Sequence, residues 1–317
     1  MQENKQYYLG IDGGGTKTAL VLVDSQECVV QKLFVEGCNP IDVGIERTKQ
    51  ILRKAIDEIC GQIPRGSICC FAGIAGGSSG NMKVQLTQFF QGLGFRASKV
   101  DSDTVNIIAA GLKGRTGIAM IMGTGIVAFV QSETGLSRVA GWGYYFDNGG
   151  SAYNIGRDGI SAFYCALDGS GAATALTDKV NCWAKENIIA ESGSAGETSV
   201  PIHQLLLGEL YASGKKLIAS FARMVFDAAQ EGDQVAKAII KRNMAQAAHV
   251  IETAGAKLNG TKHHSPIPVV IAGGLTNQEI LLDYLTDQLH DPGNYQLEVL
   301  SCEPVIGAVC LAKELGA

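Results

Sequence analysis

Apolar residues along the first third of the chain fall in short runs separated by turn residues. Three such runs follow one another with only tight turns between them, which predicts adjacent antiparallel strands at 7–11, 18–23 and 28–35. Apolar residues at helical spacing then predict a helix over 45–59. The alternation continues with a strand, a helix, a strand and a helix, at 67–74, 82–93, around 99 and 104–112. This stretch therefore predicts a βββαβα unit.

The same order starts again after residue 116. Three apolar runs predict strands at 117–122, 126–130 and 136–140. Longer helical patterns follow at 151–167, 172–185, 215–230 and 234–258. The last elements are a strand at 269–272, a helix over 277–290, a strand at 296–300 and a helix that opens at Pro304. The Gly/Ser-rich stretch 191–199 is expected to be a surface loop.

The repetition favours two lobes with a cleft between them over two unrelated α/β domains. We expect an N-terminal lobe of residues 1–114, completed by the C-terminal helix 303–317, and a C-terminal lobe of residues 115–302. The length of 317 residues and the 46% hydrophobic content suit two cores.

Composition excludes several classes of function. The net charge is −5 and no run of Lys or Arg occurs, which argues against a nucleic-acid partner. No stretch approaches the ~20 apolar residues of a membrane span, and the polar N-terminus does not resemble a signal peptide. Nine cysteines at scattered spacing do not define a disulfide framework or a metal site, so we expect a cytoplasmic protein.

The 40 glycines gather at strand ends, and the first group follows the first strand. This group is not a Walker A loop, because a strand rather than a helix follows it. Glycine N–H groups can instead turn toward phosphate oxygens, and a hydroxyl and a cation follow directly. The residues predicted to bind phosphate are Gly13, Gly14, Gly15, Thr16 and Lys17. Asp12 is placed to hold Mg²⁺, through water.

Two further glycine groups stand in the second half. Gly123, Thr124 and Gly125 form a second hairpin at the matching position of the repeat, which predicts a second phosphate-binding turn. Gly273 and Gly274 end an apolar strand shortly before Asn277, and they allow the close approach of a flat ring such as adenine. The three groups, taken in order, indicate a nucleotide site.

These motifs carry a family resemblance over essentially the whole chain. The runs GIDGGGTKT, MGTG and AGGLTN resemble the phosphate-1, phosphate-2 and adenosine segments of the actin, Hsp70 and sugar-kinase superfamily. The segment 140–153 is similar to the GWG…GSAY segment of the N-acetylglucosamine kinases, within the BadF/BadG/BcrA/BcrD ATPase family. The resemblance implies an actin-like (ribonuclease H-like) α/β fold with a central ATP cleft, ATP and Mg²⁺ as cofactors, and a small amino sugar as the phosphate acceptor. It also suggests a homodimer.

The resemblance puts the catalytic base on Asp103. A carboxylate at the cleft edge can take the proton of an attacking sugar hydroxyl, which agrees with that role. From the residues alone, Asp103 is as well explained as the N-cap of the helix that follows, and Asp101 competes for the role of base.

The resemblance also implies which residues contact the sugar. They are Asn39, Gly76, Gly77, Asp103, Gly143, Asp147, Asn148 and Ser151. Two positions depart from the family pattern: Asn148 stands where a GDEGS run has an acidic residue, and Val127 replaces the Asn of a GTGSN run. Both departures leave room for a bulkier amino sugar such as N-acetylmuramic acid, beside N-acetylglucosamine.

Three alternatives remain open from the sequence. The first is an ATPase that energises a partner reductase or dehydratase; its relatives carry a shared [4Fe–4S] cluster, for which no matching cysteine pattern occurs here. The second is a sugar-responsive regulator without catalysis. The third is a metal site at His263-His264, for which a solvent-exposed loop is the better interpretation, since no second ligand pair lies nearby.

Overall fold

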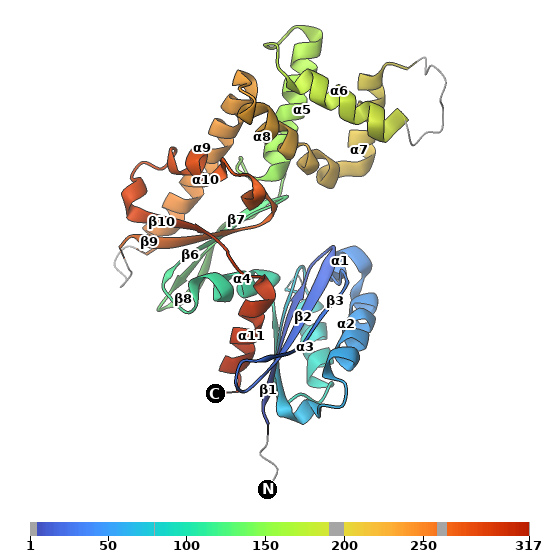
Figure 1. Ribbon diagram of the computed structural model, residues 1–317, viewed down its shortest axis with the longest axis vertical. Coiled ribbons are helices and arrows are strands. Elements are labelled where there is room, and N and C mark those ends of the chain that lie inside the picture. Colours follow the sequence, from blue (N-terminus) through green and yellow to red (C-terminus); the bar gives the residue numbers. More distant parts are fainter. Residues whose placement is uncertain (1–4, 79, 190–199, 259–264, 317) are drawn as a thin grey trace. The chain divides into compact units, whose positions relative to one another are not determined.

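Figure 1 shows the computed structural model, which describes residues 5–78, 80–189, 200–258 and 265–316. The chain divides into two compact units. Unit 1 comprises residues 1–115 together with 300–317, and unit 2 comprises residues 116–299. Each unit is built around one five-stranded sheet.

The sheet of unit 1 has the strand order β3-β2-β1-β4-β5. Its first three strands are an antiparallel meander, and the last two run parallel to β1. The strands are β1 (Tyr7–Gly13), β2 (Lys17–Asp24), β3 (Val29–Glu36), β4 (Ile68–Ile74) and β5 (Ala97–Asp101). The predicted meander is therefore confirmed, with strand ends that differ by one or two residues.

Alternation along the strands divides the core of unit 1 into two layers. Leu20 and Leu22 pack with α2 (Ile45–Cys60) and α3 (Met82–Gln91). Val21 and Val23, which point to the opposite face, pack against α11 (Pro304–Glu314). Helix α4 (Asp103–Leu112) lies against α11 on that face. A short helix, α1 (Pro40–Val43), precedes α2 and was not predicted.

The sheet of unit 2 repeats the same order, as β8-β7-β6-β9-β10. Again three strands form an antiparallel meander and two run parallel to the first of them. The strands are β6 (Gly117–Met122), β7 (Ile126–Ser132), β8 (Gly135–Ala140), β9 (Ile267–Ala272) and β10 (Tyr295–Val299). The duplicated βββαβα core predicted from the sequence is thus present.

Unit 2 has more helices between its third and fourth strands than unit 1 has. Its helices are α5 (Ala152–Asp168), α6 (Leu176–Ala184), α7 (Ile202–Ser220), α8 (Ala222–Gln230), α9 (Gln234–Ala256) and α10 (Leu281–Thr286). Buried apolar residues of α8 and α9 form one core with β6, β7 and β9. Within the described residues, no helix has the length and hydropathy needed to cross a membrane.

Two helix predictions in unit 2 were wrong. The pattern over 215–230 belongs to two helices, because α7 runs from Ile202 to Ser220, with a left-handed break at Gly214 (φ 64°), before α8 begins. In place of a helix over 277–290 there is a 3₁₀ turn at Gly274–Asn277 and then the short α10; Gln278 takes an extended conformation that separates them. The predicted loops at 191–199 and His263-His264 lie outside the described residues.

Candidate active site

The first glycine hairpin joins β1 to β2 and leaves backbone donors free. The N–H of Gly14 donates to the carbonyl of Lys17 at 3.0 Å, which closes the turn, and the N–H of Cys38 donates to the carbonyl of Gly14 at 3.0 Å. Within the described chain, no protein group accepts a hydrogen bond from the N–H of Gly15 or Thr16. These two donors are available to an anion.

The glycines of this hairpin are also required by packing. A Cβ atom added to Gly13 would lie 2.6 Å from the sulfur of Cys38, and one added to Gly15 would lie 2.9 Å from a carboxylate oxygen of Asp42. From the other side, a Cβ on Gly37 would lie 2.3 Å from the carbonyl oxygen of Gly15. The hairpin is therefore held tightly against the segment 37–42.

Asp12, near the end of β1, is partly buried, and one of its two carboxylate oxygens accepts a hydrogen bond. Its Oδ1 accepts a hydrogen bond of 2.8 Å from the side-chain amide of Asn106 on α4. Burial raises the pKa of Asp12 from 3.8 to about 6, and the negative charge of Asp103 contributes to the rise. A carboxylate with a free oxygen, a second carboxylate close by and a raised pKa fits a hard divalent cation such as Mg²⁺, which prefers oxygen ligands.

Asp103 is the first residue of α4, and the N-cap of that helix is Ser102. One carboxylate oxygen of Asp103, Oδ1, accepts hydrogen bonds from the N–H of Thr104 (3.0 Å) and the hydroxyl of Ser102 (3.1 Å). Within the described residues its Oδ2 has no hydrogen-bond partner. Burial raises the pKa of the Asp103 carboxyl. The N-cap of α4 is thus Ser102 and not Asp103, and Asp103 keeps one carboxylate oxygen free for a ligand.

Asp101, the competing carboxylate, is already engaged. Its Oδ2 forms an ion pair with the ammonium of Lys83 at 3.0 Å, and its Oδ1 accepts a hydrogen bond from the N–H of Ser102 at 2.9 Å. Both oxygens therefore have partners within unit 1, which distinguishes Asp101 from Asp103.

Two of the predicted sugar contacts come together beside the first hairpin. A Cβ added to Gly76 would lie 2.4 Å from Oδ1 of Asn39. Asn39 caps α1: Oδ1 accepts a hydrogen bond from the N–H of Ile41 (3.0 Å) and Nδ2 donates to Asp42 (2.9 Å). Gly77 instead closes a turn, donating to the carbonyl of Ile74 at 3.0 Å.

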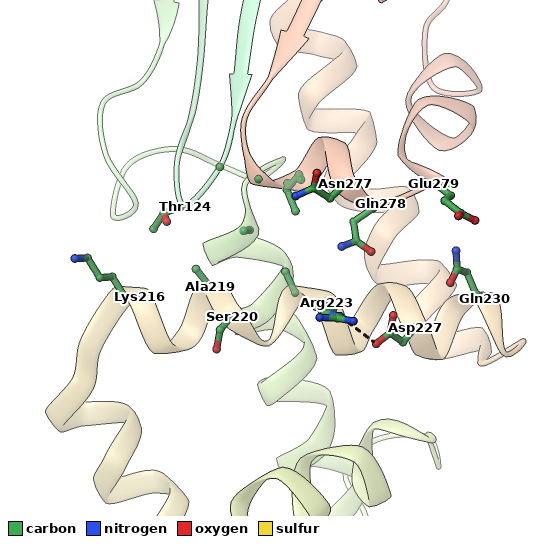
Figure 2. A pocket seen from close by; sticks show the side chains of 15 residues that line it. Thr124, Lys216, Ala219, Ser220, Arg223, Asp227, Gln230, Asn277, Gln278 and Glu279 are labelled. Carbon is green, nitrogen blue, oxygen red and sulfur yellow. Dashed lines mark ion pairs between the residues drawn. The ribbon is translucent and has the colours of Figure 1, made fainter. Parts of the chain in front are cut away.

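In unit 2 the second hairpin opens onto a cavity of about 790 Å³ (Figure 2). Four of the residues predicted to bind nucleotide line it: Gly123, Thr124, Gly274 and Asn277. The volume lies within the range of small-molecule sites. Two other predicted residues, Gly125 and Gly273, do not line this cavity. A Cβ on Gly273 would lie 2.4 Å from the carbonyl oxygen of Met122, so this glycine allows β9 and β6 to end close together.

The opposite wall of the cavity was missed by sequence reasoning. It consists of polar residues on α7 and α8, namely Lys216, Ser220, Arg223, Asp227 and Gln230. Figure 2 shows Arg223 and Asp227 as an ion pair, with a nitrogen–oxygen distance of 4.0 Å. Their spacing of four residues is typical of paired side chains on a helix. That spacing was a readable signal, but nothing in the sequence tied it to the glycine turns.

The predicted sugar segment of unit 2 is held mainly by its own backbone. The carboxylate of Asp147 accepts hydrogen bonds from the N–H groups of Trp142 (3.2 Å) and Gly143 (3.0 Å). Ser151 is the N-cap of α5, accepting a hydrogen bond from the N–H of Asn154 at 3.2 Å. Asn148 is exposed and borders a small cavity of about 180 Å³ together with Trp142 and Asp147. Of the predicted contacts in this segment, Asn148 is the side chain left free for a ligand.

Comparison with known proteins gives consistent results along the whole chain. An N-acetylmuramic acid/N-acetylglucosamine kinase of Clostridium acetobutylicum is 27% identical, with 97% of this chain and 98% of that protein aligned. An N-acetyl-D-glucosamine kinase of Dictyostelium discoideum is also 27% identical, with 98% of each chain aligned.

Among solved structures, a candidate N-acetylglucosamine kinase of Chromobacterium violaceum superimposes with a TM-score of 0.71. Its sequence identity is 21%, and 98% of this chain and 100% of that chain are covered. The likeness confirms the predicted actin-like ATPase fold. Residues 9–312 match the family described as BadF/BadG/BcrA/BcrD ATPases. The chain therefore belongs to the BadF/BadG/BcrA/BcrD ATPase family.

Proposed function

We propose that this protein transfers the γ-phosphate of ATP to a hydroxyl of an amino sugar, N-acetylglucosamine, N-acetylmuramic acid or both. The observation that carries the proposal is Asp103, a partly buried carboxylate with a raised pKa and one unoccupied oxygen. The similarity to the two amino-sugar kinases of Clostridium acetobutylicum and Dictyostelium discoideum supports the same reaction. ATP use follows the family.

Asp103 is proposed as the general base. Its Oδ1 is fixed by Thr104 and Ser102, so the side chain is held in one orientation. Its free Oδ2 would accept the proton of the sugar hydroxyl as that oxygen attacks the γ-phosphorus. A raised pKa strengthens a carboxylate as a proton acceptor. Asp101 is unsuited to the role because Lys83 and Ser102 occupy both of its oxygens.

Asp12 is proposed to hold Mg²⁺, through water, with its second carboxylate oxygen. When bound, the ion neutralises phosphate charge that builds up during transfer. The free N–H groups of Gly15 and Thr16 would donate to phosphate oxygens, and Lys17 adds a positive charge beside them. These donors are fixed before the substrate arrives, because the segment 37–42 holds the hairpin in place.

The cavity of unit 2 is proposed as the nucleotide pocket. Thr124 stands at the turn where a phosphate is expected, and Asn277 offers an amide near the predicted adenosine turn. The wall of α7 and α8 supplies further polar groups, with Lys216 and Arg223 as the positive ones.

For the sugar, Asn39 and Gly76 in unit 1 and Asn148 in unit 2 are the proposed contacts. An exposed neutral amide at position 148, in place of a carboxylate, does not repel an acidic substituent on the sugar. N-acetylmuramic acid carries such a substituent, which supports its inclusion as a substrate.

The test is ADP release from Mg²⁺-ATP, measured without sugar and then with N-acetylglucosamine, N-acetylmuramic acid, glucosamine and glucose in turn. Release that depends on an N-acetylated amino sugar is expected. Equal release with and without every sugar would point instead to an ATPase that energises a partner protein, and iron and sulfide analysis would then be the next measurement. Sedimentation of the same preparation tests the predicted homodimer.

A further inference from the structure

Asn106 is a fully buried polar residue that the reaction described so far does not use. It lies on α4 with no exposed surface. Its side-chain NH₂ group donates to Oδ1 of Asp12 at 2.8 Å and to the carbonyl oxygen of Ile11 at 3.2 Å, with the carbonyl of Gly73 at 3.5 Å. Two neighbouring parallel strands, β1 and β4, therefore present acceptors to this one amide.

The other end of the Asn106 amide has no partner. Its Oδ1 is buried and, within the described residues, accepts no hydrogen bond. Leaving such an acceptor unpaired costs about 1–3 kcal/mol. Turning the amide over would bring its oxygen against the Asp12 carboxylate and two backbone carbonyls, so the surroundings fix the observed orientation.

The fold makes room for Asn106 with two glycines from other elements, one beside its side chain and one beside its backbone. A Cβ on Gly73 of β4 would lie 2.3 Å from Nδ2 of Asn106. A Cβ on Gly307 of α11 would lie 1.9 Å from its backbone oxygen. The side-chain amide is thus enclosed by β1 and β4, and α11 packs closely on the backbone of α4 behind it, which leaves the amide little freedom to move away from Asp12.

Asn106 also stands three residues after Asp103 on the same helix. Residues at this spacing lie one above the other on a helix surface. One turn of α4 therefore carries the proposed base and the amide that holds Asp12.

We propose that Asn106 is the positioning residue for Asp12: its amide fixes Oδ1 of Asp12, leaves Oδ2 for the cation, and sets the spacing between Asp12 and Asp103. The inference rests on the proposed role of Asp12 in holding Mg²⁺. Asn106 contacts neither substrate nor cation itself.

The decisive variant is Asn106→Leu, which keeps the branching at Cγ, with a somewhat larger volume, and removes the donor together with the unpaired carbonyl. Loss of a residue that orients a metal-binding group typically costs about 10- to 100-fold in metal affinity or activity. We therefore expect the Kd for Mn²⁺, measured by EPR on the ADP-bound protein, to rise about tenfold. The half-saturating Mg²⁺ concentration for turnover should rise and kcat should fall, while the KM for the sugar stays within about twofold.

Ile108→Val is the matched control, because Ile108 is buried on the same helix and its side chain has no polar group to offer Asp12. It should lose some stability and keep the wild-type Mn²⁺ affinity. If Asn106→Leu does not fold, Asn106→Ser shortens the side chain out of reach of Asp12 without adding volume, and the same shift in Mn²⁺ affinity is expected. Mn²⁺ binding equal to that of wild type in a folded variant would overturn the proposal.

The Mn²⁺ measurement separates this proposal from the proposed function. If the wild-type protein shows no sugar-dependent turnover, the kinase reaction is contradicted. A lower Mn²⁺ affinity in Asn106→Leu than in wild type would still support the positioning role. Normal turnover in wild type with unchanged Mn²⁺ binding in the variant would refute the positioning role alone.

Discussion

The two glycine hairpins occupy the same place in the two sheets, yet their glycines serve different purposes. In unit 1, Cβ atoms on Gly13 and Gly15 would meet other atoms at 2.6 and 2.9 Å. In unit 2, Cβ atoms on Gly123 and Gly125 would meet nothing within 4 Å. Other residues pack closely against the glycines of the first turn, whereas the glycines of the second turn have open space beside them.

The difference shows that a repeated motif can be retained for unlike reasons. The glycines of the unit 1 hairpin allow close packing, and this packing holds the backbone N–H donors rigidly beside Asp12. In unit 2 the strand before the hairpin carries Ile121 where unit 1 carries Asp12, one residue before the last strand pair, and Gly123 borders the large cavity. We infer that unit 1 supplies the carboxylates of the reaction and that unit 2 supplies room for the nucleotide.

The largest effect is expected from Asp103→Asn, which tests whether the chemistry belongs to unit 1. Asparagine keeps an oxygen for the Thr104 and Ser102 bonds but cannot take a proton. We expect kcat to fall by about 10²- to 10⁴-fold, the usual contribution of general base catalysis. The Kd of a fluorescent ATP analogue should stay within about twofold, since Asp103 does not line the proposed nucleotide pocket. A kcat near that of wild type would remove Asp103 as the base.

Gly13→Ala and Gly123→Ala test the contrast between the hairpins directly. The first substitution forces a methyl group against the fully buried Cys38 and should lower the free energy of unfolding by about 1–3 kcal/mol. The second meets no atom and should leave stability unchanged while raising the KM for ATP. Urea denaturation and initial rates measure the two effects.

A double variant sharpens this test. Cys38→Ala removes the sulfur that Gly13→Ala would meet, so the pair should be more stable than the sum of the single losses predicts. Strictly additive losses would show that the clash with Cys38 is not the cause.

Asp12→Asn removes the charge that unit 2 lacks at the matching position. Because the pKa of Asp12 is raised from 3.8 to about 6 in the folded protein, the folded state loses stability as the pH rises through this window. Without Mg²⁺, the free energy of unfolding of the variant should therefore exceed that of wild type by about 1–3 kcal/mol at pH 7. This gain in stability should vanish near pH 4. Urea denaturation at several pH values measures it.

Mg²⁺ provides the control for Asp12→Asn. The ion should stabilise wild type and leave the variant unchanged, since the variant lacks the proposed binding carboxylate. A variant less stable than wild type at pH 7 would contradict the cost assigned to burying the Asp12 charge, whose neighbours include Asp103, Lys17 and Glu303.

The smallest effect is expected from Asp101→Asn, the counterpart of Asp103→Asn two residues away. The Lys83–Asp101 ion pair is partly exposed, and such pairs contribute about 0–1 kcal/mol. We expect kcat within about twofold of wild type and a small change in stability. A loss of turnover as large as that of Asp103→Asn would reassign the base to Asp101.

Much of the fold could be predicted from the sequence because its strands are marked by local pattern. The meander 7–35 is a succession of apolar runs and tight turns, and each strand end is signalled by glycine or a turn residue. The predicted helix 277–290 failed because its apolar residues, including Leu281 and Leu285, pack into the core of unit 2 from a short helix after a 3₁₀ turn. Spacing alone does not distinguish these arrangements.

The sequence by itself determined the duplicated order of strands, the glycine turns and the candidate carboxylates, because each depends on residues next to one another in the chain. Only the tertiary structure decided how these carboxylates differ. Lys83 forms an ion pair with Asp101, and burial raises the pKa of Asp103. Asn106, which lies 94 residues after Asp12, donates a hydrogen bond to the Asp12 carboxylate. Charge pairing and desolvation are set by neighbours that are close in space and distant in sequence, and no local pattern records them.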